Sequence, residues 1–288
     1  MRVLIFGGNG MLGHKLVQVF APRFETWSTI RGPFPGLERF GFFPRERTIS
    51  GIDVSDFSSV EKIINELRPD TVVNCIGVIK QRPSAADVVT TLTINSLFPQ
   101  RLAHLAEKYK FKLITISTDC VFSGTKGNYS DTDVADALDL YGQSKHWGEV
   151  SSSGCLTLRT SIIGRELSNG HSLIEWFLSQ RGKRVEGYSK AIYSGFPTIT
   201  FAGIIVEIIE NHPSLSGVYN VSSDPISKFD LLTKLKDRLK FDIEITDSTR
   251  LIIDRSLNSG RFRQQTGFAP KSWDEMIESL AADCRQYE

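Results

Sequence analysis

Three short segments carry the side chains that could do chemistry in this chain. The first is a glycine-rich turn, with glycines at positions 7, 10 and 13 directly after the apolar run Val3–Phe6. Glycines between an apolar strand and a helical pattern are typical of a turn that binds a dinucleotide, because they allow a tight turn, close approach of the pyrophosphate and close helix packing. The first N–H groups of the helix then face the phosphates. The residues predicted to hold the dinucleotide here are Gly7, Asn9, Gly10, Met11, Leu12 and Gly13.

The second segment places a phenol and an amine one helical turn apart. Tyr141 and Lys145 stand at i and i+4, so they share one face of a helix. A free phenol has a pKa of about 10 and is a poor acid–base catalyst at neutral pH, and a nearby ammonium lowers that pKa. The pattern predicts a proton donor with its electrostatic partner. The alternative is a solvated helix face with one half-buried tyrosine.

The third segment is Ser117-Thr118-Asp119, at the end of an apolar run that reads as a buried strand. Open α/β sheets bind ligands at the carboxyl ends of their strands. A hydroxyl of Ser117 or Thr118 could therefore donate a hydrogen bond to a substrate oxygen. The alternative is that these side chains only cap the strand end.

Strands and helices must alternate along the first half of the chain to position these segments. Strands are predicted at 2–6, 24–30, 47–52, 70–76, 111–117 and 156–160, and helices at 11–20, 56–67, 88–109 (broken near Pro99) and 141–150. A helix N-cap is expected at Ser55 or Asp56. The long segment 31–45, rich in Gly, Pro, Phe and Arg, reads as a functional loop or lid. This order predicts an α/β fold with a doubly wound parallel sheet.

After about residue 163 the pattern is looser. Helices are predicted at 172–180, 198–210, 228–239 and 272–282, with a strand at 217–221. We expect a Rossmann-like nucleotide-binding domain over residues 1–163, with parts of 195–225, and a smaller, interleaved C-terminal substrate-binding domain over 164–288.

Together, in this order, the three segments resemble the extended short-chain dehydrogenase/reductase superfamily. The match is closest to the dTDP-4-dehydrorhamnose reductase family. The motifs that carry the resemblance are Ile116-Ser117-Thr118-Asp119 with Val121-Phe122, Tyr141-Gly142-x-x-Lys145-x-x-Gly148-Glu149, Leu158-Arg159-Thr160-Ser161, Gly195-Phe196-Pro197-Thr198, Arg255-Ser256-Leu257-Asn258-Ser259 and Trp273.

The resemblance implies an NAD(P)-dependent reductase of a nucleotide-diphospho-4-keto-6-deoxy sugar. Tyr141 would donate the proton, Lys145 would support it and Thr118 would hold the substrate oxygen. Further cofactor contacts are then expected at Arg31, Asp53, Val54, Cys75, Ile76, Gly77, Asn95, Ser117, Tyr141, Lys145 and Ser161. Substrate contacts are expected at Thr118, Asp119, Tyr141, Ile162 and Arg165. Lys80, Gln81, Arg82 and His171 could also reach the substrate diphosphate, or could have surface roles, as could Arg165.

Cofactor choice can be argued from the second strand. Sites that prefer NAD usually end this strand with an acid, and here it ends Thr29-Ile30-Arg31. Arg31 could pair with a 2′-phosphate through its planar guanidinium, so we predict NADPH over NADH. The alternative is that Arg31 is a solvated loop residue. Asp53 is expected at the adenine, or else as the N-cap of the following helix.

Two positions depart from the family pattern near the sugar. Cys120 stands where the family usually has tyrosine, and Ile162 where it usually has tryptophan. Losing two aromatic side chains changes pocket shape and stacking. Another nucleotide-linked 4-keto-6-deoxy sugar, for example an N-acetylated one on UDP, is therefore as plausible a substrate as dTDP-4-dehydrorhamnose. A nucleotide-sugar epimerase with bound NAD, or a non-catalytic regulatory subunit of the same fold, are the alternatives.

Composition restricts the class of protein. The 288 residues are 40% hydrophobic and 23% charged, with a formal net charge of +1, which gives no argument for nucleic acid or an anionic membrane as partner. No apolar stretch approaches the length of about 18 residues that spans a bilayer. The four cysteines are far apart and the histidines show no ligand spacing, so no metal site is expected. We expect a cytoplasmic protein, compatible with a homodimer.

Overall fold

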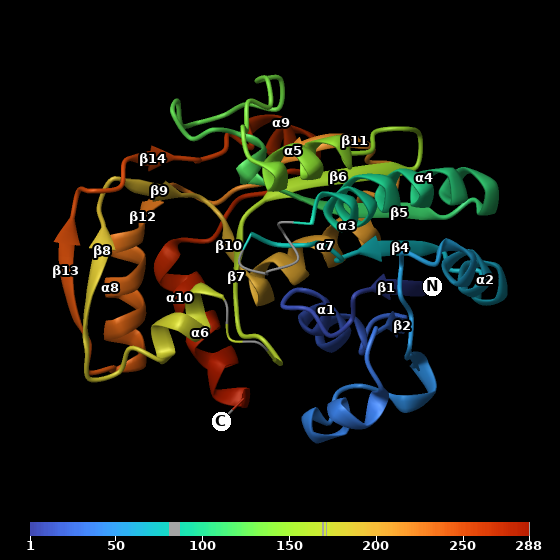
Figure 1. Ribbon diagram of the computed structural model, residues 1–288, viewed down its shortest axis with the longest axis horizontal. Helices are drawn as coiled ribbons and strands as arrows, with labels where there is room; N and C mark the ends of the chain where they lie inside the picture. The colour runs from blue at the N-terminus through green and yellow to red at the C-terminus, as the bar shows by residue number, and fades with distance from the viewer. Residues whose placement is uncertain (81–86, 169, 171, 288) are drawn as a thin grey trace. The chain divides into compact units, whose positions relative to one another are not determined.

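A computed structural model describes residues 1–80, 87–168, 170 and 172–287 of the chain (Figure 1). The chain folds into two compact units, each built from separate stretches of sequence. Unit 1 comprises residues 1–118, 138–158 and 202–218, and unit 2 comprises 119–137, 159–201 and 219–288. The division expected from the sequence differs chiefly in residues 119–137, which belong here to unit 2.

The elements of unit 1 alternate strand and helix. They are β1 (Arg2–Phe6), α1 (Gly13–Phe20), β2 (Glu25–Thr29), η1 (Phe34–Phe40), η2 (Arg45–Arg47), β3 (Thr48–Ile49), α2 (Phe57–Leu67), β4 (Thr71–Asn74), α3 (Val88–Leu92), the π-helix η4 (Thr93–Leu97), α4 (Phe98–Tyr109), β5 (Lys112–Thr118) and α5 (Leu140–Trp147). Three elements contribute residues to both units: β6 (Cys155–Thr160), α7 (Thr198–Asn211) and β11 (Gly217–Asn220).

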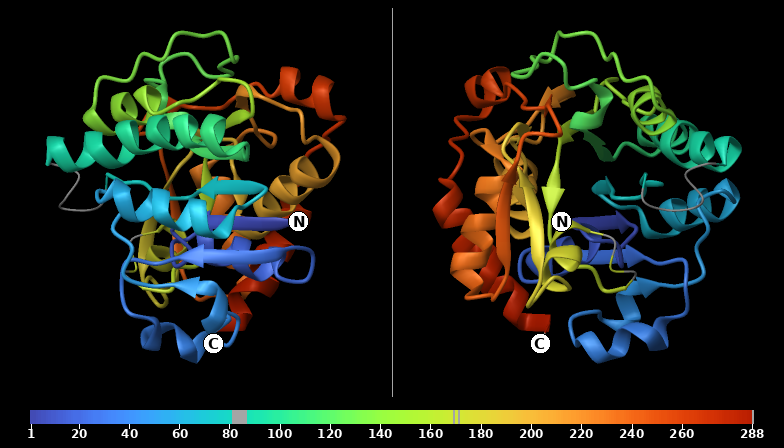
Figure 2. Two further views of the ribbon diagram at one scale, coloured as in Figure 1. Left: turned by 90° about the vertical axis from the view of Figure 1, so that its right-hand side faces the viewer. Right: turned by 60° about the vertical axis from the view of Figure 1, so that its left-hand side comes forward.

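A seven-stranded parallel sheet organises unit 1, in the order β11-β6-β5-β4-β1-β2-β3 (Figures 1 and 2). The strand order reverses direction at β1, between its neighbours β2 and β4. Because parallel crossovers are right-handed, this reversal places the helices on both faces of the sheet. The predicted doubly wound, Rossmann-like α/β fold is confirmed.

One apolar layer of unit 1 joins the sheet to α2 and α4. Leu4 and Phe6 of β1 pack there with Ile64 of α2 and Leu102 of α4, all of them buried. At roughly 1.5–3 kcal/mol per buried large side chain, such a layer stabilises the sheet strongly. The strand ends are therefore held in fixed positions for the side chains that follow them.

The helix predicted over residues 88–109 is interrupted close to Pro99, as expected, but the proline itself is not the cause. Pro99 does not break it, because Pro99 lies in the first turn of α4, where a missing N–H costs no hydrogen bond. The interruption is the π-helical turn Thr93–Leu97, which lies just before α4. Single π-turns of this kind are frequent at functional sites.

The segment between β2 and β3, expected to be a loop, contains two short 3₁₀ helices, η1 and η2. Phe34, Leu37 and Phe43 of this segment are buried. Apolar side chains therefore hold this segment in place. Its two helices are too short to give a periodic pattern of apolar residues in the sequence, so they were not predicted.

Unit 2 is built from short elements. They are η5 (Asp119–Val121), β7 (Ile162–Ile163), α6 (Leu173–Leu178), β8 (Arg184–Tyr188), β9 (Ala191–Tyr193), β10 (Phe196–Pro197), β12 (Ile226–Ser227), α8 (Lys228–Leu239), β13 (Glu244–Ser248), β14 (Ile253–Asp254), α9 (Gly260–Thr266), α10 (Trp273–Cys284) and η6 (Arg285–Tyr287). The strands pair as β10-β7, β12-β9-β14 and β13-β8. Strands of two or three residues show no alternation, so the sequence did not reveal most of them.

The glycine-rich turn depends on two glycines for its backbone path. Gly7 adopts a φ of 83°, in the left-handed region that other residues avoid. A Cβ on Gly13 would lie 2.0 Å from the carbonyl oxygen of Gly7, and one on Gly10 would lie 3.3 Å from the same oxygen. Helix α1 thus packs against the turn at Gly13, whereas Gly10 leaves more room.

We expect Gly13→Ala to lower the free energy of unfolding by about 2 kcal/mol or more, since overpacking at a rigid backbone atom forces the chain to shift. Gly10→Ala is the matched control and should cost less than about 1 kcal/mol. Urea unfolding followed by circular dichroism measures both. Equal stability of the two variants would contradict the close packing at Gly13.

Candidate functional site

The turn before α1 leaves backbone donors available. Gly8 donates to Thr29 O at 2.8 Å, and Gly10 donates to Gly7 O at 3.0 Å. Neither Met11 N–H nor Leu12 N–H donates a hydrogen bond to the backbone of the turns, loops and caps in the part of the chain that the structure describes. Two adjacent N–H groups of this kind at a helix start suit a phosphate group.

His14 fixes this turn from the helix side. It is fully buried, and its Nδ1 lies 2.8 Å from Gly10 O. Burial lowers the pKa of His14 to about 4, so the ring is neutral near pH 7 and Nδ1–H donates to the carbonyl. His14 therefore positions the turn and brings no positive charge to a phosphate there.

Lys145 ties α5 to the end of β5. Its Nζ donates to Ile116 O at 2.6 Å, and the side chain is almost completely buried. Thr118 follows two residues later on the same strand, about 7 Å further along at the usual strand rise. Tyr141 lies one helical turn before Lys145, on the same face of α5. The Lys145 side chain thus joins α5 to β5 two residues before Thr118.

Burial governs the charge of Lys145. It lowers the pKa of the ammonium to about 8, and the nearby Glu149 carboxylate opposes this in part. The same burial raises the pKa of the Cys75 thiol to about 12, so this thiol stays protonated. A Cβ on Gly77 would lie 3.9 Å from Lys145 Nζ, which places the backbone after β4 beside the ammonium.

Asn95, in the π-turn η4, joins the loop after β4 to α5. Its side-chain amide accepts from Val78 N at 2.8 Å and donates to Val78 O and to Ser144 Oγ, each at 3.1 Å. Both N–H groups and the oxygen of this amide are therefore already bonded within unit 1. Asn95, predicted as a cofactor contact, positions the Gly77 backbone relative to the helix that carries Tyr141 and Lys145.

Glu149 has a role that the sequence did not indicate. Its Oε1 accepts from Ser117 Oγ at 2.8 Å, and its Oε2 lies 2.9 Å from His146 Nδ1. Its side chain is 5% exposed, so its charge acts strongly on Lys145 four residues earlier. The i, i+4 spacing to Lys145 was the available signal. Ser117, predicted as a cofactor contact, is bonded to this carboxylate.

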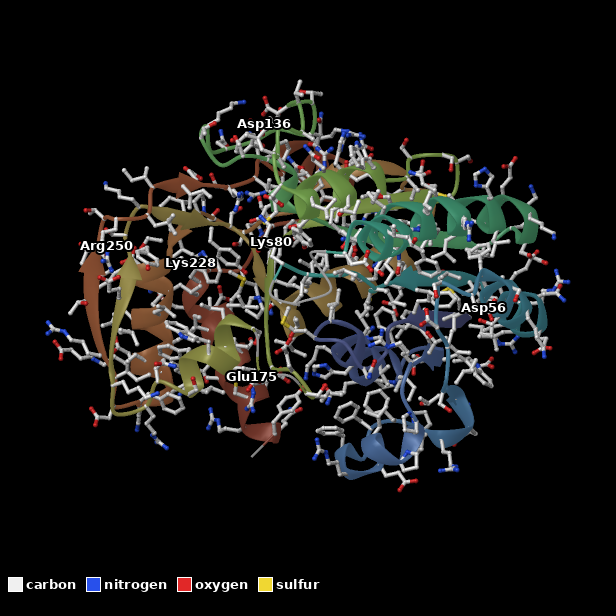
Figure 3. The ribbon with its side chains drawn as sticks, in the orientation of Figure 1. Asp56, Lys80, Asp136, Glu175, Lys228 and Arg250 are labelled. Carbon is white, nitrogen blue, oxygen red and sulfur yellow. The ribbon has the colours of Figure 1, made fainter. Side chains whose placement is uncertain are left out.

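Asp139 and Lys80 brace the start of α5. Asp139 is its N-cap and accepts from Gly142 N at 2.9 Å. The Nζ of Lys80, labelled in Figure 3, donates to Asp139 at 2.7 Å and lies 5.6 Å from the ring centroid of Tyr141. The Lys80 ammonium thus lies over the aromatic ring of Tyr141.

Arg31 and Asp53 follow β2 and β3 in unit 1. Arg31 is exposed, and its charge helps to lower the pKa of Asp53, after the hydrogen bonds from the Ser55 backbone and side chain. The N-cap of α2 is Asp56, so the alternative of Asp53 as N-cap is wrong. Val54 is buried. Ile76 packs under Gly7, where a Cβ would lie 2.8 Å from its Cγ1.

Four predicted site residues lie in unit 2. Asp119 is buried directly after Thr118 in the chain, and Ile162 belongs to β7. Ser161 O accepts from Phe196 N at 2.9 Å. Arg165 is paired with Glu175 at 2.7 Å and donates to Cys284 O at 3.3 Å, so its charge is compensated within the unit. Gln81, Arg82 and His171 lie outside the described residues.

The family of the chain follows from comparison with known sequences. The family model described as RmlD substrate binding domain matches residues 1–285. The chain belongs to this family. Nearly the whole chain is covered, so both units fall within the match.

Relatives of this RmlD-family protein include sugar-nucleotide reductases and subunits of methionine adenosyltransferase. A "dTDP-4-dehydrorhamnose reductase" from Aggregatibacter actinomycetemcomitans is 24% identical over 98% of each chain. A "Methionine adenosyltransferase 2 subunit beta" from Mus musculus is 25% identical over 90% of this chain and 79% of its own length. The fold matches that of a Bacillus anthracis dTDP-4-dehydrorhamnose reductase solved with NADP, with a TM-score of 0.78 and 21% identity over 97% of this chain and 98% of the other.

Two negative findings apply to the described part of this RmlD-family chain. None of the helices described there has the length and apolar character needed to cross a membrane. The same residues include no group of three or more His, Cys, Asp or Glu side chains arranged to hold a metal ion.

The buried carboxylate at Glu149 should raise the pKa of Lys145. We expect the side chain of Lys145 to titrate near pH 8 in the free protein, and at a lower pH in Glu149→Gln, since the opposing negative charge is removed. NMR titration of the lysine ε-carbons measures this, with Lys145→Met to assign the signal. A Lys145 signal that titrates near its ordinary value of about 10.4 would overturn the burial argument.

Proposed function

We propose that the protein is an NADPH-dependent reductase of a nucleotide-diphospho-4-keto-6-deoxy sugar. The observation that supports the proposal is the Lys145 Nζ–Ile116 O hydrogen bond, which joins the helix that carries Tyr141 and Lys145 to β5, two residues before Thr118. A phenol, an ammonium and an alcohol near one sheet edge suit the reduction of a carbonyl group. The names of the reductase relatives support the substrate class.

The mechanism uses hydroxyl groups to stabilise charge on the carbonyl oxygen. When bound, a nicotinamide would supply hydride for the keto carbon, which would leave negative charge on the carbonyl oxygen. Tyr141 Oη donates its proton to that oxygen, and Thr118 Oγ1 donates a hydrogen bond to it. The Lys145 ammonium stabilises the resulting phenolate, as does the charge of Lys80 over the ring.

The residues of unit 1 fit a dinucleotide. The N–H groups of Met11 and Leu12 suit its pyrophosphate, and the space around Gly10 allows close approach. The Lys145 ammonium, beside Gly77, suits the ribose hydroxyls. Arg31, exposed after β2, suits a 2′-phosphate and supports NADPH over NADH.

A non-catalytic role is the second candidate, because several relatives are named as a subunit of methionine adenosyltransferase. A binding subunit has no need of Thr118, Tyr141 and Lys145 together, which favours the reductase. Incubation with NADPH and a panel of dTDP- and UDP-linked 4-keto-6-deoxy sugars separates the two. Loss of the NADPH absorbance supports the reductase, and no loss across the panel supports the subunit.

Replacing Tyr141 by Phe keeps the ring and removes the proton donor. We expect kcat to fall about 10²–10⁴-fold, the usual contribution of general acid–base catalysis, while the Kd for NADPH stays within about threefold. Stopped-flow assays and fluorescence titration with NADPH measure the two. Near-wild-type turnover in Tyr141→Phe would remove this residue from the mechanism.

Replacing Arg31 by Ala tests the choice of cofactor. We expect NADPH to bind about 10-fold to 100-fold more weakly and NADH about equally well, since one charge-assisted contact to the 2′-phosphate is lost. Arg39→Ala is the control, on the same segment. If the ratio of the dissociation constants for NADPH and NADH is the same in Arg31→Ala and wild type, Arg31 does not determine the preference for NADPH.

A further inference from the structure

Unit 2 contains a cavity of about 480 Å³ whose wall mixes charged and aromatic side chains. The lining includes Asp119, Cys120, Trp176, Tyr193, Lys228 and Arg255. Cavities of this size hold small ligands, and a few polar groups in them fix the orientation of the ligand. The charged side chains of the wall therefore determine which chemical group fits.

Lys228 occupies an unfavourable position for a cation. It is the first residue of α8, after the N-cap Ser227, where the helix dipole is positive. Burial also lowers the pKa of its ammonium to about 8. Both effects work against the charged form, so a purely structural role would be served better by an apolar residue.

The Lys228 ammonium has an aromatic neighbour rather than a carboxylate partner. Its Nζ lies 4.1 Å from the ring centroid of Tyr193. Among the described residues, Lys228 forms no ion pair with a carboxylate within 4.0 Å. Burial raises the pKa of Tyr193 well above its usual range, so the ring remains a neutral phenol that cannot compensate the charge.

The other charges that line the cavity are largely compensated or positive. Glu186 is paired with Arg250, which Figure 3 labels together with Lys228. The Arg255 guanidinium donates to Phe122 O at 2.9 Å and Ser123 O at 3.3 Å, which are neutral acceptors. Asp119 is the lining carboxylate whose charge acts on Lys228. Apart from the Glu186–Arg250 pair, the lining thus includes two cationic side chains, Lys228 and Arg255, and one carboxylate, Asp119.

We propose that Lys228 binds an oxyanion of the substrate in this cavity and thereby selects nucleotide-linked sugars, an inference that rests on the proposed function. The N-terminus of α8, like the Lys228 ammonium, favours a negatively charged ligand. Asp119 and Cys120 line the same cavity and follow Thr118 directly in the chain, so the lining starts one residue after the side chain proposed to hold the sugar oxygen. The oxyanion is a phosphoryl group of the nucleotide, since a 6-deoxy sugar carries a methyl group where a uronate has its carboxylate.

Isothermal titration calorimetry without NADPH tests this directly. The probes are uridine, UDP, dTDP, UDP-glucose and UDP-glucuronate, and the variants are Lys228→Met and Lys228→Arg. Lys234→Met is the control, because Lys234 lies on the same helix and is paired with Asp274 at 2.6 Å. Thermal melts establish that each variant is folded.

For a phosphoryl group, Lys228→Met should weaken UDP, dTDP and UDP-glucose about 10-fold to 100-fold, the range of one charge-assisted hydrogen bond, and leave uridine unchanged. A loss of affinity confined to UDP-glucuronate would mean that Lys228 contacts a sugar carboxylate, and it would overturn the inference. Lys228→Arg should retain most of the affinity. No binding by the wild type, or equal affinities in wild type and Lys228→Met, overturns the inference. Oxyanion binding without reduction of any keto sugar rejects the proposed function instead.

Discussion

The buried ammonium of Lys145, bonded to the Ile116 carbonyl, is the interaction on which unit 1 depends at the carboxyl end of its sheet. Removing a charge from water is costly unless polar groups replace the lost solvent. Here a strand carbonyl, the Glu149 carboxylate and the polar backbone after β4 do so. The other polar contacts of this region hold the strand carbonyl, the Glu149 carboxylate and the backbone after β4 in position around the ammonium.

Those contacts come from four separate stretches of the chain. The π-turn presents Asn95 to the loop after β4 and to Ser144, and Glu149 bonds Ser117 at the end of β5. Asp139 caps α5 and is held by Lys80. Each bond alone is modest, about 0.5–1.5 kcal/mol, yet buried networks lose more when one member is removed because the other members are left unpaired.

Much of this arrangement could be predicted because local sequence determines it. The β1 strand, the glycine turn and helix α8 at 228–239 follow from apolar periodicity, glycine and capping residues. The seven-stranded parallel sheet follows from the alternation of strands and helices. The π-turn at Thr93–Leu97 and the short strands of unit 2 could not be predicted, since they depend on contacts between residues distant in sequence. For Glu149 the spacing to Lys145 was a local signal, whereas its bond to Ser117 joins residues distant in sequence. The predicted contacts of Arg31 and Arg165 with ligands involve molecules outside the chain, and they stay predictions.

The division of the chain has a consequence for its synthesis. β11 completes the sheet beside β6, yet it leaves the ribosome long after β6 because residues 161–201 of unit 2 come between them. At about 5–20 residues per second, the nascent chain exposes the unpaired edge of β6 for several seconds. Every residue of that strand is buried in the finished protein. Such an edge is a template for pairing with another chain. The nascent chain is therefore most prone to aggregation just before Asn220, the last residue of β11, leaves the ribosome.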